Sequence, residues 1–275
     1  MNRKPIIFSL LACLPFATQA QEHSLEKIWQ TDTVIAVPES VLPDFKEKIL
    51  YVSLIDGPGW AADGKGGVGK LDMTGKIIDT TWITGLNAPK GLARVGNRLY
   101  VADITEIVVI DIPKGKIEKK IAVAEAQNLN DVTASDKGEV YVSDSKKGRI
   151  YKLYNNEVTV YLDSLKGTNG IKAVKDDLYI LSGKNFIKAD AQKNITHMAI
   201  LTEGGDGLEP VGNGDFLATS WAGLIYYVHA SGQVDLLLDY RPQKKNTADI
   251  GYDPVKRILY LPTFNGKTVE AFKVK

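Results

Sequence analysis

The sequence predicts an all-β protein, and more specifically a six-bladed β-propeller. Six segments of the chain share a turn, then an apolar strand with an aromatic residue, then often a small or acidic residue. The aromatic residues are separated by 49, 41, 38, 37 and 44 residues, intervals typical of one four-stranded blade. They are Tyr51, Tyr100, Tyr141, Tyr179, Phe216 and Tyr260. Further short strands lie between them and no helical periodicity is sustained, so each repeat is expected to form one blade.

The two ends of the chain are expected to close the ring of blades. The segment "KIWQTDTVIAV" (27–37) has the composition of a strand, and the chain ends on a second strand, "TVEAFKVK" (268–275). Pairing of the first with the second would complete the sheet of the last blade. Truncation after residue 235 should therefore leave open sheet edges and unfold the protein.

Length and composition favour one globular domain with a near-neutral surface. A hydrophobic fraction of 44% over 275 residues supports a sizeable core. The net charge is +1, and removal of Arg3 and Lys4 with a leader would leave 32 basic against 33 acidic residues. Nothing in this balance points to nucleic acid or to a charged membrane surface. We expect residues 21–275 to form one propeller domain, and the protein to be a monomer.

The N-terminus has the pattern of an export signal, residues 1–20. A basic "MNRK" precedes the apolar run "PIIFSLLACLPFA" and a small-residue cleavage site, "TQA". This predicts a periplasmic protein that begins at Gln21. The alternative is a lipoprotein anchored through Cys13, read from "LLAC". Cleavage after Ala20 leaves no Cys, which excludes disulfides, and no other apolar stretch is long enough to span a bilayer.

The stretch "DGKGGVGKL" (63–71) contains the G-x-x-x-x-G-K core of a nucleotide-binding P-loop. That motif needs a Ser or Thr after the Lys and a helix leaving the loop. Here Leu71 follows Lys70, and "KLDMTGKII" has the pattern of strand, turn and strand. We interpret the glycines as a hairpin or inter-strand loop, and we expect Lys70 to bind no phosphate.

A second repeated position lies 10 to 12 residues before each aromatic residue. Its tetrapeptides are "PESV", "PKGL", "LNDV", "TNGI", "GDGL" and "ADIG". In a propeller the innermost strands line the central channel, so equivalent residues from all blades converge on one axis. The residues in this column are Glu39, Lys90, Asn130, Asn169, Asp206 and Ala248.

Together these features resemble the regucalcin, gluconolactonase and paraoxonase-like propellers. The matching pieces are "PESV", "LND", "NGI" and "DGL", one per blade and in order, and with the repeats the resemblance covers roughly residues 30 to 275. It implies that Glu39, Asn169 and Asp206 ligate one divalent cation. It also implies that Asn130 sits beside the metal and touches the substrate or its water.

The residue types agree with that implication. Oxygen donors without His or Cys favour Ca²⁺, with Mg²⁺ and Zn²⁺ as alternatives. Three protein ligands leave room for water and a substrate oxygen, as hydrolysis of a sugar lactone or related ester by a metal site requires. Asp206 is the candidate general base.

Lys90 departs from the family pattern. Its ammonium group could pair with Glu39 and oppose metal binding, or it could bind an acidic substrate. Two functions therefore stay open: a metal-dependent hydrolase, and a non-catalytic propeller that binds a ligand or partner at the same channel mouth.

Other interpretations apply to several of these residues. Asn-Gly, Asp-Gly and Asn-Asp pairs are common in ordinary turns. Trp221 either walls the channel mouth and contacts substrate or packs between blades. The three histidines, at 23, 197 and 229, have no ligand spacing, and no G-x-S-x-G motif is present.

Overall fold

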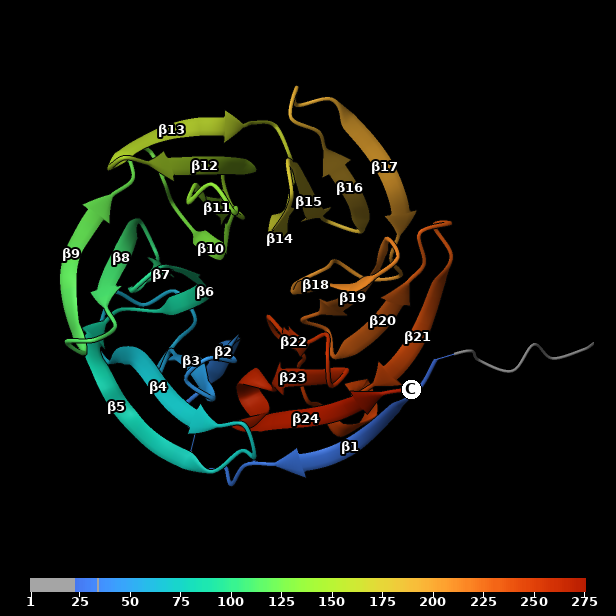
Figure 1. Ribbon diagram of the computed structural model, residues 1–275, viewed down its shortest axis with the longest axis horizontal. Coiled ribbons are helices and arrows are strands. Elements are labelled where there is room, and N and C mark those ends of the chain that lie inside the picture. Colours follow the sequence, from blue (N-terminus) through green and yellow to red (C-terminus); the bar gives the residue numbers. More distant parts are fainter. Residues whose placement is uncertain (1–22, 34) are drawn as a thin grey trace, which may run out of the picture.

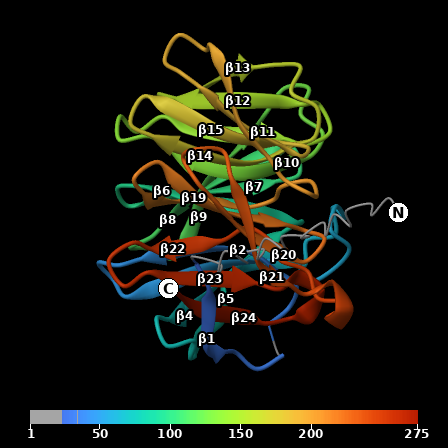
Figure 2. The same ribbon diagram turned by 90° about the vertical axis from the view of Figure 1, so that its right-hand side faces the viewer.

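The computed structural model describes residues 23–33 and 35–275, which form six four-stranded antiparallel sheets. The sheets are arranged in a ring around a central axis (Figure 1), and from the side the ring is a thick disc (Figure 2). The predicted six-bladed β-propeller is thus confirmed. The predicted leader, with Cys13 and its cleavage site, lies outside the described residues.

Each blade contains four strands, numbered from the channel outward. Blade 1 consists of β2 (Pro38–Asp44), β3 (Ile49–Leu54), β4 (Gly66–Asp72) and β5 (Ile77–Leu86). Blade 2 consists of β6 (Pro89–Val95), β7 (Arg98–Asp103), β8 (Glu106–Asp111) and β9 (Lys116–Ala122). Blade 3 consists of β10 (Leu129–Ala134), β11 (Val140–Asp144), β12 (Arg149–Tyr154) and β13 (Glu157–Leu162). Blade 4 consists of β14 (Thr168–Val174), β15 (Asp177–Ser182), β16 (Asn185–Ala189) and β17 (Ile195–Ile200). Blade 5 consists of β18 (Leu208–Gly212), β19 (Asp215–Ser220), β20 (Leu224–Val228) and β21 (Val234–Asp239).

Blade 6 is built from both ends of the chain, as predicted. Its order is β22 (Gly251–Asp253), β23 (Ile258–Pro262), β24 (Val269–Val274) and then β1 (Leu25–Gln30) from the N-terminal side. Strand β1 runs antiparallel to β24, with Leu25 opposite Val274 and Gln30 opposite Glu270. Two short 3₁₀ helices complete the elements, η1 (Arg241–Gln243) and η2 (Phe264–Gly266).

A buried carboxylate ties β1 to this blade. Glu270 is fully buried and lies 2.8 Å from Lys27 Nζ of β1 and 2.6 Å from Lys245 Nζ. It also accepts a 2.6 Å hydrogen bond from the hydroxyl of Tyr240. Burial alone would raise the pKa of Glu270, but the hydrogen bonds from Lys245, Lys27 and Tyr240 outweigh it and lower the pKa below its ordinary value.

The core lies between the blades. Six hydrophobic clusters are found among the described residues, one at each interface between neighbouring blades. The repeated aromatic residues all lie in the second strand of their blade and take part in these clusters. Tyr51, for example, packs against Leu92 and Val101 of blade 2. The repeat therefore exists because each blade buries its apolar face only against its neighbour.

The P-loop-like stretch is a strand, which excludes the helix that a phosphate loop needs. Our placement of its glycines in a loop was partly wrong, because Gly66, Gly67 and Gly69 lie within β4. A side chain at Gly67 would come within 2.2 Å of the carbonyl oxygen of Ile83 in β5. The glycines allow this close approach of two backbones.

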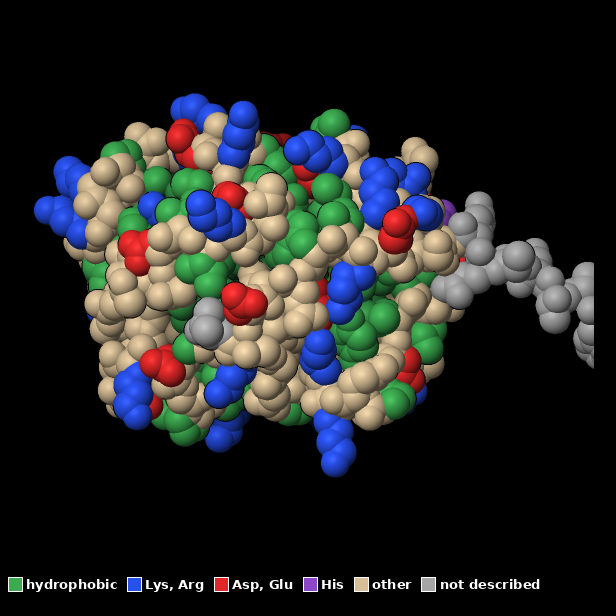
Figure 3. Space-filling model, turned by 90° about the horizontal axis from the view of Figure 1, so that it is seen from below, with side chains coloured by type: hydrophobic (Ala, Val, Ile, Leu, Met, Phe, Trp, Pro, Cys, Tyr) green, Lys and Arg blue, Asp and Glu red, His purple; other side chains and the backbone are tan. Residues whose placement is uncertain are grey.

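The surface carries mixed charge. The view onto the rim of the disc shows basic and acidic side chains interspersed with apolar ones (Figure 3). No helix in the described part of the chain is long and apolar enough to cross a membrane.

Candidate functional site

The residues of the repeated column stand where the innermost strands begin. Glu39, Lys90, Asn130 and Asn169 are each the second residue of such a strand, and Asp206 precedes β18 by two residues. In blades 1 to 4 the pairing register shifts at this point, between the first and the fourth residue of the strand. A shift of this kind frees a side chain from the regular alternation and turns it toward a site.

Where the register shifts, backbone N–H groups of the innermost strand lose their partners in the sheet. Hydroxyl groups on the second strand accept hydrogen bonds from these N–H groups instead. Ser53 Oγ accepts the N–H of Ser40 at 2.9 Å, and Ser143 Oγ accepts the N–H of Asp131 at 2.9 Å. The acidic residues that follow the aromatic strands accept hydrogen bonds from backbone N–H groups just before the innermost strands. In blade 2, for example, the carboxylate of Asp103 accepts the N–H of Ala88 at 2.8 Å, just before β6. In blades 1 to 3 these small and acidic residues thus hold the start of the innermost strand in place.

Five residues of the column face one cavity of about 390 Å³ at the channel mouth. They are Glu39, Lys90, Asn130, Asn169 and Asp206, and the cavity is completed by Gly59, Trp60, Trp221 and Phe264. The sixth member, Ala248, does not line it: Ala248 is buried and its carbonyl accepts a hydrogen bond from Thr219 Oγ1. The structure therefore brings together side chains up to 167 residues apart in the chain, Glu39 and Asp206.

Lys90 and Glu39 form a buried pair. Lys90 Nζ lies 3.6 Å from Glu39 Oε1, and both side chains are almost completely buried. The other oxygen of this carboxylate, Oε2, is buried without any hydrogen-bond partner. Burial raises the pKa of Glu39, and the Lys90 ammonium only partly offsets this effect. An unpartnered buried carboxylate oxygen is costly and marks a position where a ligand would be stabilised.

Asp206 is the second buried carboxylate of the cavity. Its Oδ1 accepts a 2.5 Å hydrogen bond from Asn169 Nδ2. Its pKa lies well above the ordinary value, first because the group is buried and then because the carboxylates of Glu39 and Asp249 are near. With Glu39 and Asp206 ionised and Lys90 protonated, the cavity carries a formal charge of −1.

The amide of Asn130 is oriented by a neighbour. Its Nδ2 donates to Ser145 Oγ at 2.9 Å, which leaves the side-chain carbonyl oxygen as an acceptor. Among the described residues, no group of three or more His, Cys, Asp or Glu side chains is placed to share a metal ion. Any cation at this site would therefore rely on two carboxylates and on amide oxygens.

Aromatic residues wall one side of the mouth, and sequence reasoning found only one of them. Trp221 lines the cavity and is half exposed. Trp60, from the loop between β3 and β4, lies with its ring 4.3 Å from Lys90 Nζ. Phe264 of η2 packs edge-to-face on Trp221 at 5.7 Å between ring centroids. Phe264 also has a φ of +46°, an unfavourable conformation for a bulky residue. The glycine-rich segment around Trp60 was the one feature of the sequence that could have indicated a loop at the channel mouth.

A second layer of ionisable side chains lies along the channel beside the cavity, and the sequence analysis missed it. Lys172 Nζ and Glu209 Oε1 are 2.7 Å apart, and Ser40 Oγ donates to Asp249 at 2.5 Å. These residues and Asp131 line a space of about 20 Å³, room for about one water molecule. Burial raises the pKa of Asp249 to about 7, and that of Asp131 well above its ordinary value.

Comparison with known proteins supports the fold. No family model and no curated protein matches the sequence. A catalytically inactive variant of virginiamycin B lyase from Staphylococcus aureus, solved with quinupristin, is similar with a TM-score of 0.66 and 14% identity, over 92% of this chain and 99% of that one. A streptogramin B lyase has a TM-score of 0.68 and 10% identity, over 92% and 98% of the chains. A luciferin-regenerating enzyme has a TM-score of 0.65 and 13% identity, over 92% and 95%. At these identities the likeness shows the six-bladed fold alone, a fold that these propeller enzymes share with this chain.

Proposed function

We propose that the protein is a divalent-cation-dependent hydrolase of sugar lactones or related esters, with the cation held by Glu39, Asn169 and Asp206. The observation that carries this proposal is the unpartnered, buried Oε2 of Glu39 in a cavity that is also lined by the carboxylate of Asp206. A cation would satisfy that oxygen and remove the excess negative charge.

The donor set fits a hard cation. Glu39 and Asp206 offer carboxylate oxygens, and Asn169 donates through Nδ2, so its carbonyl oxygen stays available as a ligand. Oxygen donors of this kind suit Ca²⁺ best and Mg²⁺ second, whereas Zn²⁺ prefers His and Cys. Such a cation would polarise the substrate carbonyl.

Lys90 favours a substrate with an acidic group. A divalent cation would change the formal charge of the cavity from −1 to +1, which an anionic substrate would neutralise. The Lys90 ammonium is held between Glu39 at 3.6 Å and the ring of Trp60 at 4.3 Å, so little of its motion remains to be lost on binding. Lys90 would bind the acidic group, and Trp221 would contact the ring of the substrate.

The remaining groups can orient and deprotonate a water molecule. Asp206 would accept a proton from the attacking water at its carboxylate, and the carbonyl oxygen of Asn130 would accept a hydrogen bond that orients the same water. The second candidate function is the non-catalytic binding propeller. It is favoured by one observation, that the Lys90 ammonium already lies beside Glu39 as a built-in cation.

Metal analysis and calcium-dependent melting test the proposal. Protein purified without chelator should contain one divalent ion, and Ca²⁺ at about a hundred times its Kd should stabilise the fold by about 2.7 kcal/mol. Glu39→Gln and Asp206→Asn should lose this shift. Glu209→Gln, which removes a buried carboxylate outside the proposed ligands, should keep it.

The Lys90→Gln variant separates the two functions. If Lys90 anchors substrate, the variant keeps the calcium shift and loses preference for carboxylate-bearing over neutral lactones. If Lys90 replaces the metal, wild type shows no shift and the variant gains one. Absence of an ion and of a shift in both proteins would refute the hydrolase and leave the binding propeller.

A further inference from the structure

We propose that the protein has a second binding site, for a straight-chain anionic amphiphile, in an apolar groove between blades 6 and 1. The groove lies at the turns that join the first to the second strand of these blades, away from the column of site residues at the strand beginnings. It has a volume of about 580 Å³, within the range of small-molecule sites. Its lining residues are Phe45, Lys48, Asp72, Met73, Thr74 and 253–256.

The turns of blades 1 and 6 differ from the equivalent turns of the other blades. Blade 1 has Phe45 in this turn and blade 6 has Pro254 and Val255. The corresponding segments in blades 2 to 5 are "VGNR", "SDKGE", "VKDD" and "GNGD", whose turn residues are polar or Gly. The apolar residues are not needed to form such a turn, because four turns of the same protein form without them.

These apolar side chains stay exposed to solvent. Val255 is 91% exposed and Phe45 is 48% exposed. The two turns are neighbours because β2 and β22 come from adjacent blades, joined by a bridge between Ser40 and Asp249. Met73, in the turn between β4 and β5, adds a third apolar side chain to the same groove. Apolar side chains gathered in one groove mark a binding site more often than single exposed residues do.

The charges around the groove favour a negative head group. Asp253 accepts the N–H groups of Val255 and Lys256 at 3.0 and 2.9 Å, and Asp72 accepts those of Thr74 and Lys76 at 2.8 and 3.0 Å. Each carboxylate thus binds the backbone of its own turn through Oδ1. The ammonium groups of Lys48 and Lys256 form no ion pair with any described residue, so they remain free for an anion.

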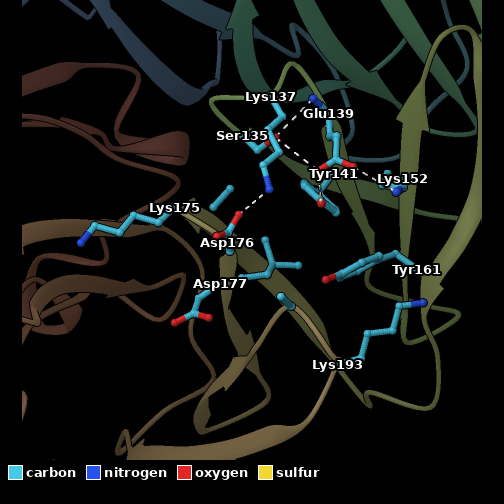
Figure 4. Close-up of a pocket in the computed structure, with 13 residues that line it drawn as sticks. Ser135, Lys137, Glu139, Tyr141, Lys152, Tyr161, Lys175, Asp176, Asp177 and Lys193 are labelled. Atoms are coloured by element: carbon cyan, nitrogen blue, oxygen red, sulfur yellow. Dashed lines mark hydrogen bonds and ion pairs between the residues drawn. The ribbon is translucent and has the colours of Figure 1, made fainter.

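The equivalent groove between blades 3 and 4 is lined mainly by charged and polar residues. It is lined by the corresponding turns, with Ser135, Lys137 and Glu139 from blade 3 and 175–177 from blade 4 (Figure 4). There Lys137 pairs with Asp176 at 2.6 Å and Lys152 with Glu139 at 3.1 Å, whereas Lys175 points away. This polar groove contains two ion pairs besides the unpaired Lys175 and Lys193, whereas the apolar groove has no ion pair among its described lining residues and has an apolar floor beside Lys48 and Lys256. An acyl chain with a terminal carboxylate matches that combination.

Calorimetric titration with sodium dodecanoate below its micelle concentration tests the site. One equivalent should bind, and decanoate should bind more weakly, by about fourfold for each fully buried methylene that it lacks. Dodecyltrimethylammonium, which has the same chain and the opposite charge, should bind about tenfold more weakly than dodecanoate. Equal binding of the anionic and cationic amphiphiles would overturn the proposal.

Variants locate the site. Val255→Asn and Phe45→Asn should each weaken dodecanoate binding about tenfold, and Lys48→Gln with Lys256→Gln should do the same. These side chains are exposed, so the fold tolerates their replacement. Lys137→Gln in the polar groove is the matched control and should change nothing. Loss of binding in Trp60→Ala instead would place the amphiphile in the candidate functional site, and binding only to anionic phospholipid vesicles would point to a membrane. Either result would refute the proposed groove site.

Discussion

Ring closure through β1 depends on one buried carboxylate, and Glu270→Gln tests this directly. In wild type the charge of Glu270 is shared by Lys27 and Lys245, and its oxygen accepts the hydroxyl of Tyr240. The substitution keeps the shape of the side chain but removes the negative charge between two ammonium groups. Lys27 joins β1 to the rest of blade 6, so the loss should weaken the closure of the ring.

The structure allows an estimate of the cost. Breaking a buried ion pair from one side typically costs about 3–5 kcal/mol. Lys27 and Lys245 are 40% and 22% exposed, so water recovers part of this energy, and we expect about 3 kcal/mol. For a domain of this size that corresponds to a fall in Tm of about 6–12 °C.

Thermal unfolding followed by circular dichroism at several pH values is the assay. The pKa of Glu270 is lowered in the folded state, so its contribution is fully present above the ordinary value of 4.5 and is lost as the pH falls through the folded-state pKa. The difference between wild type and Glu270→Gln should therefore be large at pH 7 and shrink as the pH falls below 4.5. Glu26→Gln, on the exposed side of β1, is the control and should leave Tm unchanged. A Glu270→Gln protein as stable as wild type at pH 7 would refute the reasoning.

Three further predictions test the fold and the N-terminus. Truncation after residue 235 removes most of β21 and three strands of blade 6, among them β24, the partner of β1, so the product should lack cooperative unfolding by circular dichroism; a stable folded fragment would contradict the closed ring. Ser53→Ala should lower the free energy of unfolding by about 1–3 kcal/mol in urea titrations, because the buried N–H of Ser40 loses its acceptor, and an unchanged midpoint would refute that role. If the predicted leader is cleaved, mass spectrometry of the mature protein should give an N-terminus at Gln21, whereas a lipid on Cys13 would show the lipoprotein alternative.

The fold was predictable because each repeat contains a large aromatic side chain at an equivalent position. An aromatic residue in each second strand takes part in the apolar cluster with a neighbouring blade, and this requirement recurs at the length of a blade. Sequence reasoning placed the glycines of 66–69 less well, because it interpreted them as turn formers. They serve a long-range contact instead, the approach of β5 to β4, and no local pattern reports such a contact.

Apart from Trp221, the residues that line the cavity were predictable only where they follow the repeat. Glu39, Asn130, Asn169 and Asp206 were found because each stands 10 to 12 residues before an aromatic residue. Trp60 and Phe264 reach the cavity from a loop and a 3₁₀ helix, which have no counterpart of the same length in other blades. Their sequence positions carry no period, so only the folded chain shows that they face the column. The apolar groove escaped notice for the related reason that an exposed Val255 in a turn has no meaning until Phe45 and Met73 lie beside it.

Under the proposed function, Lys90 would determine which ligands the cavity can accept. The other four column residues in the cavity are acids or amides, so without Lys90 the formal charge would be −2 and a divalent cation would be neutralised by the protein alone. With Lys90 present, a bound divalent cation leaves a charge of +1, and a carboxylate-bearing ligand completes the balance. Cation and acidic ligand would then each strengthen the binding of the other by the same factor, as thermodynamic linkage requires. The Lys90–Glu39 pair would in this way make the cavity selective for the two ligands together rather than for either one alone.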